Sequence, residues 1–178
     1  MIRLFVAVRP PAPIRDVLID TMDGIDGARW QDEEQLHLTL RFIGEVDRPV
    51  AEDVAGMLAR VDAPSFDLAI AGVGHFATKG RATALWARPR PSPELEALQH
   101  KVERACQQAG LPPERRKFTP HITLARLGRS AGPIGGWLAA HGALSLPPWR
   151  VDEFRLYEST LSPAGAQYDP VVRYPLQG

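Results

Sequence analysis

The spacing of apolar residues changes several times along the chain, and each change marks a predicted element. Residues 2–8 read IRLFVAV, a β-rich run that is ended by Pro10 and Pro11. Runs of this kind predict strands at residues 2–8, 36–43, 66–73, 83–87 and 121–127, and near 150–158 and 168–174.

Between these strands the apolar residues recur at helical spacing. In residues 93–109 they fall at positions 95, 98, 102, 105 and 109, and Gly110 is a suitable helix end. Similar stripes predict helices at residues 13–22, 49–61, 93–109 and 133–140, and the segment GHFATKGRA reads as a connection.

Two strand–helix–strand units with antiparallel hairpins between them predict an α+β fold. We expect a single bilobal domain over residues 1–178, in which two pseudo-symmetric lobes of antiparallel sheet are flanked by helices. A cleft between two such lobes is a natural ligand site.

One short pattern occurs twice, once in each half of the chain. HLTLRFI begins at His37 and HITLARL begins at His121, so the two histidines lie 121 − 37 = 84 positions apart. Alternate residues of a strand point to the same face. His37 therefore shares a face with Thr39, and His121 shares one with Thr123, while the apolar residues between them face a core.

Two imidazoles and two hydroxyls that meet across a cleft form an acid–base set for phosphate chemistry. A single buried His beside a Thr is usually a satisfied polar pair, but two copies with matching neighbours indicate a function. Imidazole has an ordinary pKa of about 6.5, so one ring can be neutral while the other is charged. One ring then activates water while the other protonates a leaving group, and the hydroxyls hold phosphate oxygens. Bound phosphate favours the charged rings, and we expect a bell-shaped rate profile with its optimum between roughly pH 6 and 8.

The composition narrows the possible partners. The 178 residues include 21 Lys and Arg and 21 Asp and Glu, so phosphate must be held by a local site rather than by overall charge. The single cysteine, Cys106, excludes an internal disulfide. His75, His100 and His141 are scattered along the chain, so we expect no metal site. No run is apolar enough for a signal peptide or a membrane span, so we expect a cytoplasmic protein without a membrane partner.

The double motif resembles the twin His-x-Thr-x signatures of the 2H phosphoesterase superfamily. More closely, the chain is similar to the bacterial and archaeal RNA 2′,3′-cyclic phosphodiesterases, also called 2′-5′ RNA ligases. The similarity runs nearly end to end and includes the opening RLFVAV, Arg29-Trp30, GHF, ALWARP and Tyr168. It implies a two-lobed α+β fold and hydrolysis of RNA 2′,3′-cyclic phosphate ends to 2′-phosphomonoesters, with no metal or other cofactor. Reversible 2′-5′ ligation is the second reaction that the family name describes, and we expect a monomer.

The resemblance also implies a role for each motif residue. His37 would donate a proton to the leaving 3′ oxygen, and His121 would accept a proton from the attacking water. Thr39 and Thr123 would hold the non-bridging phosphate oxygens. The family commonly has a basic residue at the position of Arg126.

Two arginines compete for the contact with phosphate. Strict alternation places Arg126 on the face opposite His121 and Thr123, so it reaches the cleft only if the strand ends or bulges before it. By the same parity Arg41 shares the face of His37 and is the alternative cation.

Aromatic and basic residues near the motifs are candidates for contact with the rest of a nucleotide. Phe42, Phe76 and Trp30 are candidates for stacking on a base, with core packing as the alternative for each. Two basic segments, KGR at 79–81 and RRK at 115–117, either follow an RNA backbone or lie in solvated turns.

Three functions remain open from the sequence. The main interpretation is a metal-independent cyclic phosphodiesterase that acts on RNA ends. The second is a phosphodiesterase for a small cyclic nucleotide or ADP-ribose cyclic phosphate, which the zero net charge mildly favours. The third is a non-catalytic nucleotide-binding module, against which the paired histidines argue, because a binder needs no acid–base pair.

Overall fold

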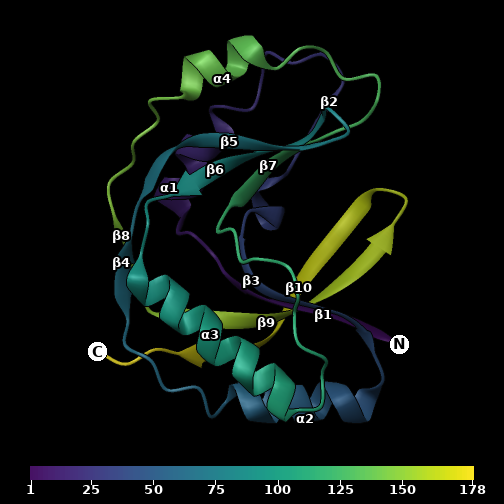
Figure 1. Ribbon diagram of the computed structural model, residues 1–178, viewed down its shortest axis with the longest axis vertical. Helices are drawn as coiled ribbons and strands as arrows, with labels where there is room; N and C mark the ends of the chain where they lie inside the picture. Colours follow the sequence, from purple (N-terminus) through teal and green to yellow (C-terminus); the bar gives the residue numbers. More distant parts are fainter.

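The computed structural model describes residues 1–178 as a large antiparallel sheet in two halves, flanked by helices (Figure 1). Its strands are β1 (Ile2–Val8), β2 (Ala28–Trp30), β3 (Leu38–Val46), β5 (Ile70–Thr78), β6 (Arg81–Pro89), β7 (Ile122–Leu127), β9 (Glu153–Ser162) and β10 (Gly165–Pro175). In space they follow the order β10-β9-β1-β3-β7-β6-β5, and β2 pairs with β7.

Four α-helices flank the two halves of the sheet. They are α1 (Ala12–Ile19), α2 (Arg48–Leu58), α3 (Pro93–Gln108) and α4 (Gly135–His141), and a 3-10 turn spans Glu33–Gln35. Helices α2 and α3 contact each other, and they contact β1 and β3 respectively, whereas α4 contacts β5. The indole nitrogen of Trp137 in α4 donates a 2.8 Å hydrogen bond to the carbonyl of Thr21, just beyond α1. In Figure 1, α2 and α3 accordingly lie at the lower end of the molecule and α4 at the upper end.

The two halves of the sheet meet at a single residue pair. Strand β3 pairs with β7 only through Leu38 and Ile122, whose side chains are fully buried. Away from this point β3 pairs along β1, and β7 pairs along β6. The sheet is therefore two antiparallel lobes that touch where β3 and β7 begin, which confirms the expected α+β fold with two lobes.

The apolar stripes predicted from the sequence form the core. In α3 the residues at 95, 98, 102 and 105 are buried, together with Cys106. Burial raises the pKa of the Cys106 thiol to about 11, so the thiol stays protonated at neutral pH. Ser92 caps the N-terminus of this helix, because its hydroxyl accepts a 3.1 Å hydrogen bond from the backbone N–H of Leu95.

The segment expected to be a connection between two strands is itself a β-hairpin. Strand β5 continues to Thr78 and β6 starts at Arg81, and the turn residues Lys79 and Gly80 have φ angles of 53° and 77°. Two successive positive φ angles match the natural twist of a tight hairpin. His75 consequently lies in a strand, exposed, rather than in a loop.

A small second sheet holds the C-terminal end of the chain. It consists of β4 (Phe66–Leu68) and β8 (Trp149–Val151). Next to it, the backbone N–H of Ser65 donates a 2.7 Å hydrogen bond to the carbonyl of Gln177. None of the helices combines the length and the apolar character that crossing a membrane requires.

Candidate active site

His37 and His121 stand immediately before the two strands that meet at the lobe junction. Nδ1 of His37 lies 2.7 Å from the carbonyl oxygen of Gln35, and Nδ1 of His121 lies 2.6 Å from that of Thr119. A carbonyl oxygen can only accept, so Nδ1 carries the hydrogen in both rings and Nε2 is the free nitrogen. The same contact, two residues upstream, orients both imidazoles.

A β-bulge follows the first motif. Thr39 and Arg41 pair with consecutive residues of β1, which leaves Leu40 as an extra residue between them. Leu40 and Arg41 are both buried, so the alternation of faces breaks at this point. Phe42 therefore joins Thr39 on the cleft side, and Arg41 turns towards α3.

An equivalent bulge follows the second motif. Thr123 and Ala125 pair with consecutive residues of β6, which leaves Leu124 as the extra residue. Arg126 consequently faces the cleft together with Thr123. The strand thus bulges before Arg126, as it must if this arginine is to reach the cleft. The two bulges lie 124 − 40 = 84 positions apart, the same spacing as the histidines, so Phe42 and Arg126 hold equivalent places in the two lobes.

Arg41 is engaged by protein partners instead. Its Nε donates a 2.5 Å hydrogen bond to the carboxylate of Glu103, and its terminal nitrogens donate to the carbonyls of Phe42 (2.8 Å) and Pro112 (2.6 Å). The residue is only 7% exposed. Because of the bulge, Arg41 does not line the cavity that holds both histidines, although it borders the wider groove beside Thr39. Arg41 ties the segment before the second motif to β3.

Both motifs line one cavity of about 170 Å³ at the lobe junction. Besides the motif residues and Phe42 and Arg126, its wall contains Arg3, Phe5, Gln31, Ser159 and Tyr168. A wider groove of about 570 Å³ continues from the same residues along Phe76, Arg116, Lys117 and Phe118.

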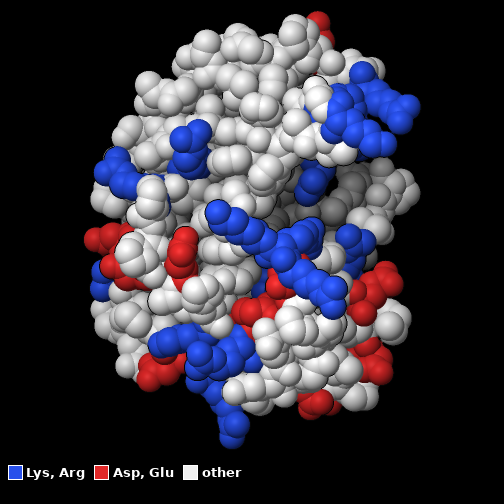
Figure 2. All heavy atoms as spheres, viewed as in Figure 1, with Lys and Arg blue, Asp and Glu red and all other residues white.

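The charge of this cleft is almost entirely positive. No carboxylate lines the smaller cavity, and the one in the wider groove, Glu114, lies 3.3 Å from the guanidinium of Arg116. Figure 2 shows this side of the molecule hollowed to the right of its centre, with Lys and Arg side chains gathered along the borders of the hollow. A chain without net charge thus presents a local site for an anion.

Aromatic rings enclose each imidazole. The His37 ring lies 4.7 Å from Phe5 and edge-on to Tyr168 at 5.2 Å, measured between ring centroids. The His121 ring lies edge-on to Phe76 at 4.8 Å and 5.9 Å from Trp86. These contacts limit rotation of both rings and exclude water from one side of each.

The glycine of the GHF segment makes room for one of these rings. Trp86 lies across Gly74, and a Cβ atom at that position would stand 2.5 Å from the indole. Only glycine allows the indole to pass this close to the backbone of β5. Gly74 therefore sets the position of a ring that packs beside His121.

Burial lowers the pKa values of both histidines. The pKa of His37 falls to about 4, first because of desolvation and further because of the charges of His121 and Arg126, against the hydrogen bond to Gln35. Desolvation lowers the pKa of His121 too, aided by Arg126 and opposed by the carbonyl of Thr119. Both shifts start from the ordinary pKa of about 6.5 and favour the neutral form of each ring in the empty cleft.

The other candidates from the sequence lie at different distances from the cleft. Trp30 packs against Trp137 with ring centroids 6.0 Å apart and lines neither part of the cleft. The KGR segment forms the tight turn between β5 and β6, and Arg81 donates to the carbonyl of Leu127 (3.3 Å). Phe76 and two residues of the RRK segment do line the wider groove.

Several residues of the cavity carry no local signal in the sequence. Arg3, Gln31 and Ser159 lie far apart in the chain and outside both motifs, and β1, β9 and the segment after β2 bring them to one place. Tyr168 entered only through the family resemblance. Knowledge of strand pairing, in particular that β1 lies between β3 and β9, would have revealed Arg3.

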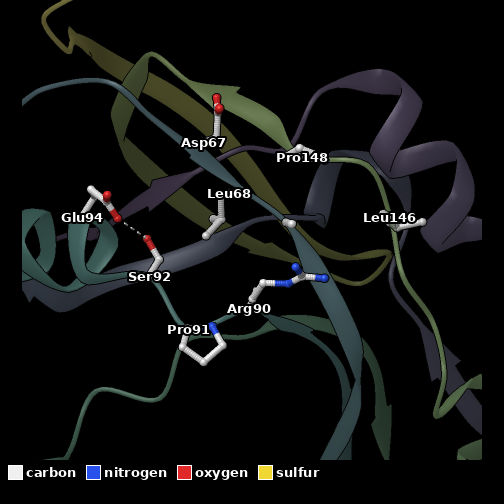
Figure 3. A pocket seen from close by; sticks show the side chains of 9 residues that line it. Asp67, Leu68, Arg90, Pro91, Ser92, Glu94, Leu146 and Pro148 are labelled. Carbon is white, nitrogen blue, oxygen red and sulfur yellow. Dashed lines mark hydrogen bonds between the residues drawn. The ribbon is translucent and has the colours of Figure 1, made fainter.

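A separate cavity of about 260 Å³ lies between β4 and the start of α3 (Figure 3). Its polar side chains are Asp67, Arg90, Ser92 and Glu94, and Ser92 already caps α3 and donates to Glu94 (3.4 Å). No histidine lines it, so it offers no pair of imidazoles. Nowhere in the chain do three or more His, Cys, Asp or Glu side chains gather as a metal site would require.

Solved structures share the whole architecture. A structure from Thermus thermophilus matches with a TM-score of 0.82 and 27% identity, over 99% of this chain and 98% of that one. Escherichia coli LigT in its apo form matches with a TM-score of 0.78 and 26% identity, over the same shares of the two chains. LigT complexed with 3′-AMP matches with a TM-score of 0.79 and 26% identity, over 99% of both chains.

Proteins of similar sequence carry one shared name. The protein from Aeropyrum pernix named RNA 2′,3′-cyclic phosphodiesterase is 33% identical over 140 residues, which cover 77% of this chain and 80% of that protein. The Thermotoga maritima protein of the same name is 32% identical over 156 residues, covering 85% and 81%. The family model described as the 2′-5′ RNA ligase superfamily matches residues 10–162, which include both motifs and both bulges. The chain therefore belongs to the 2′-5′ RNA ligase superfamily.

Proposed function

We propose that the protein hydrolyses the 2′,3′-cyclic phosphate at RNA ends to a 2′-phosphomonoester, without a metal ion. The observation that carries this proposal is one cavity in which two imidazoles with free Nε2 atoms stand beside two threonines. The relatives named RNA 2′,3′-cyclic phosphodiesterase support it, as do the LigT structures complexed with 3′-AMP and with phosphate.

In the proposed reaction, water attacks phosphorus in line with the bond to the 3′ oxygen. Nε2 of His121 takes a proton from the water as its oxygen bonds to phosphorus. The bond between phosphorus and the 3′ oxygen breaks, and the Nε2–H of His37 gives its proton to that oxygen. The products are a 2′-phosphomonoester and a free 3′ hydroxyl, and the histidines exchange a proton with solvent before the next turnover.

The remaining motif residues hold the phosphate. The hydroxyls of Thr39 and Thr123 donate hydrogen bonds to its two non-bridging oxygens. Arg126 has no protein partner among the hydrogen bonds of the structure and faces the same cavity, so its guanidinium is available for the phosphate. Such donors act most strongly on the extra charge that develops when water adds to phosphorus.

The order in which the two histidines take up protons depends on the substrate. In the empty cleft the charge of His121 is one cause of the low pKa of His37, so a proton on one ring opposes a proton on the other. The proposed roles require the proton on His37. A bound phosphate anion lies between the rings and raises the pKa of both, and the leaving oxygen lies next to His37 in the proposed pose.

The wider groove suits the nucleotide that carries the cyclic phosphate. Phe42 and Phe76 both line this groove and offer faces for a base, and Lys117 and Arg116 offer charge to the backbone beyond it. All of these residues come from one chain, so we expect a monomer to be active. We place the enzyme in the cytoplasm, with RNA ends as its substrates and 2′-5′ ligation as the reverse reaction.

A comparison of three substrates tests this proposal. An oligoribonucleotide with a 2′,3′-cyclic phosphate end, a nucleoside 2′,3′-cyclic phosphate and an ADP-ribose cyclic phosphate are compared by kcat/KM, and ³¹P NMR identifies the product. We expect the oligonucleotide to be the best substrate and a 2′-phosphomonoester to be the product. Preference for a small molecule would replace RNA as the substrate, and binding without turnover would identify a binding module. His100→Ala is the matched control, because His100 is exposed on α3.

A further inference from the structure

Arg3 is a cation of the cleft that lies outside both motifs. It is half-buried in β1, two residues before Phe5, so both side chains project to the face that carries His37. Arg3 lines the 170 Å³ cavity together with both histidines and both threonines, and it does not line the wider groove.

The guanidinium of Arg3 has no anionic or hydrogen-bonding partner in the protein. Its one specific contact is with an aromatic face, where Cζ lies 5.4 Å from the centroid of the Phe42 ring. By contrast, the buried Arg41 is bonded to Glu103 and to two carbonyls. Arg3 is thus positioned by a ring that leaves its donors free.

The pseudo-symmetry of the lobes relates the position of Arg3 to that of Arg126. Phe42 occupies the place in the first lobe that Arg126 occupies in the second, because equivalent bulges precede them. The first motif therefore lacks an arginine of its own at this place. Phe42 stands there instead, and Arg3 from the neighbouring strand places its guanidinium over the Phe42 ring.

We propose that Arg3 is the first-lobe counterpart of Arg126 and binds the reacting phosphate as a catalytic residue. Each non-bridging oxygen then receives one threonine hydroxyl and one guanidinium, one set from each lobe. This inference rests on the proposed function for the identity of the substrate, and it adds a second cation to the charge that stabilises the transition state.

Loss of this contact has a predictable size and a predictable signature. Arg3→Ala is expected to lower kcat/KM on a nucleoside 2′,3′-cyclic phosphate by roughly 10- to 100-fold, as for removal of one charge-assisted donor. Arg3→Lys, which keeps the charge but not the planar fork, is expected to recover part of the loss. The loss should be the same on a cyclic-phosphate oligonucleotide, because Arg3 contacts the phosphate that both substrates share.

Phosphorothioate substrates separate a direct contact from a structural role. The two diastereomers of a nucleoside 2′,3′-cyclic phosphorothioate each replace one non-bridging oxygen by sulfur. We expect Arg3→Lys to change the rate ratio of oxygen to sulfur for one diastereomer and Arg126→Lys to change it for the other. If both variants alter the same diastereomer, or if Arg3→Lys alters neither, the proposal is overturned.

Binding of inorganic phosphate tests the contact without turnover. Calorimetry on the intact protein is expected to show about tenfold weaker phosphate binding in Arg3→Ala and an unchanged affinity in the control Arg48→Ala, whose side chain is exposed on α2. Unchanged affinity in Arg3→Ala would overturn the proposal. If the wild-type protein hydrolyses no cyclic phosphate but Arg3→Ala loses affinity for phosphate, the proposed function fails while the assignment of Arg3 stands. A loss restricted to the longer substrate would instead place Arg3 on a neighbouring phosphate and would also overturn it.

Discussion

The low pKa values of the two histidines predict an acid-shifted profile for kcat/KM. The pH dependence of kcat/KM reflects the pKa values of groups in the free enzyme, and the reaction needs one protonated and one neutral imidazole. The pKa of His37 is about 4, and that of His121 lies below its ordinary 6.5. The singly protonated pair therefore predominates only between these limits. We expect the optimum of kcat/KM between about pH 4 and 6.5, with a decline of about tenfold per pH unit above it.

The optimum of kcat is expected at higher pH, because bound phosphate raises both pKa values in the complex. Stopped assays on a nucleoside 2′,3′-cyclic phosphate from pH 4 to 9, at saturating and at low substrate, give the two profiles. Arg126→Gln removes a charge that lowers the pKa of both rings, so its kcat/KM optimum should move to higher pH, whatever its absolute rate. An optimum of kcat/KM at or above pH 7 in the wild-type protein would refute this reasoning.

The same pKa shift contributes to stability. The pKa of His37 is lower in the folded protein than in the unfolded chain, so below pH 6.5 the unfolded chain binds more protons and stability falls until about pH 4. A shift from 6.5 to about 4 corresponds to a loss of up to about 3 kcal/mol. Urea unfolding at several pH values should show this loss in the wild-type protein and a flatter dependence in His37→Gln. Parallel curves for the two proteins would contradict the assigned pKa.

The cleft and the residues that support it lead to three more predictions. A p-nitrophenyl phosphodiester has a leaving group that needs no acid. His37→Ala should therefore recover much of its lost rate on this substrate, and His121→Ala should not. Rescue of His121→Ala instead would reverse the assigned roles. Activity should persist after exhaustive treatment with EDTA and should not rise with Mg²⁺, Mn²⁺ or Zn²⁺, whereas loss with recovery by one metal would show metal dependence. Glu103→Ala leaves the buried Arg41 without its carboxylate and should lower the free energy of unfolding in urea by about 3–5 kcal/mol. The control Glu52→Ala, in the exposed pair with Arg48, should lower it by at most about 0.5 kcal/mol. Equal effects of the two variants would contradict the role of the buried pair.

The sequence predicted the parts of the fold that depend on local periodicity. The helical stripe in α3 and the β-rich run of β1 were found because each buries a regular face, and the predicted range 2–8 coincides with β1. The three-residue strand β2 was missed, because a segment so short shows no period. The β5–β6 turn was missed because Lys79 adopts a positive φ that its residue type does not announce.

The candidate site was predicted only as far as each motif is local. The duplicated His-x-Thr pattern identified four residues that the structure brings to one cavity. Alternation beyond Thr39 failed, because a bulge depends on how a strand pairs with its neighbour, and this exchanged the expected places of Arg41 and Phe42. Arg3 was missed for a related reason: only the pairing of β1 with β3 brings it to the motif.

In the proposed mechanism His37 and His121 act as one acid–base pair on a cyclic phosphate. The most direct test is kcat for His37→Ala, His121→Ala and the double variant, measured on the same 2′,3′-cyclic phosphate substrate. We predict a loss of about 10²–10⁴-fold in each single variant, and little further loss in the double variant, because groups that act as a unit are not additive. Near-wild-type turnover in either single variant, or losses that multiply in the double variant, would contradict the account.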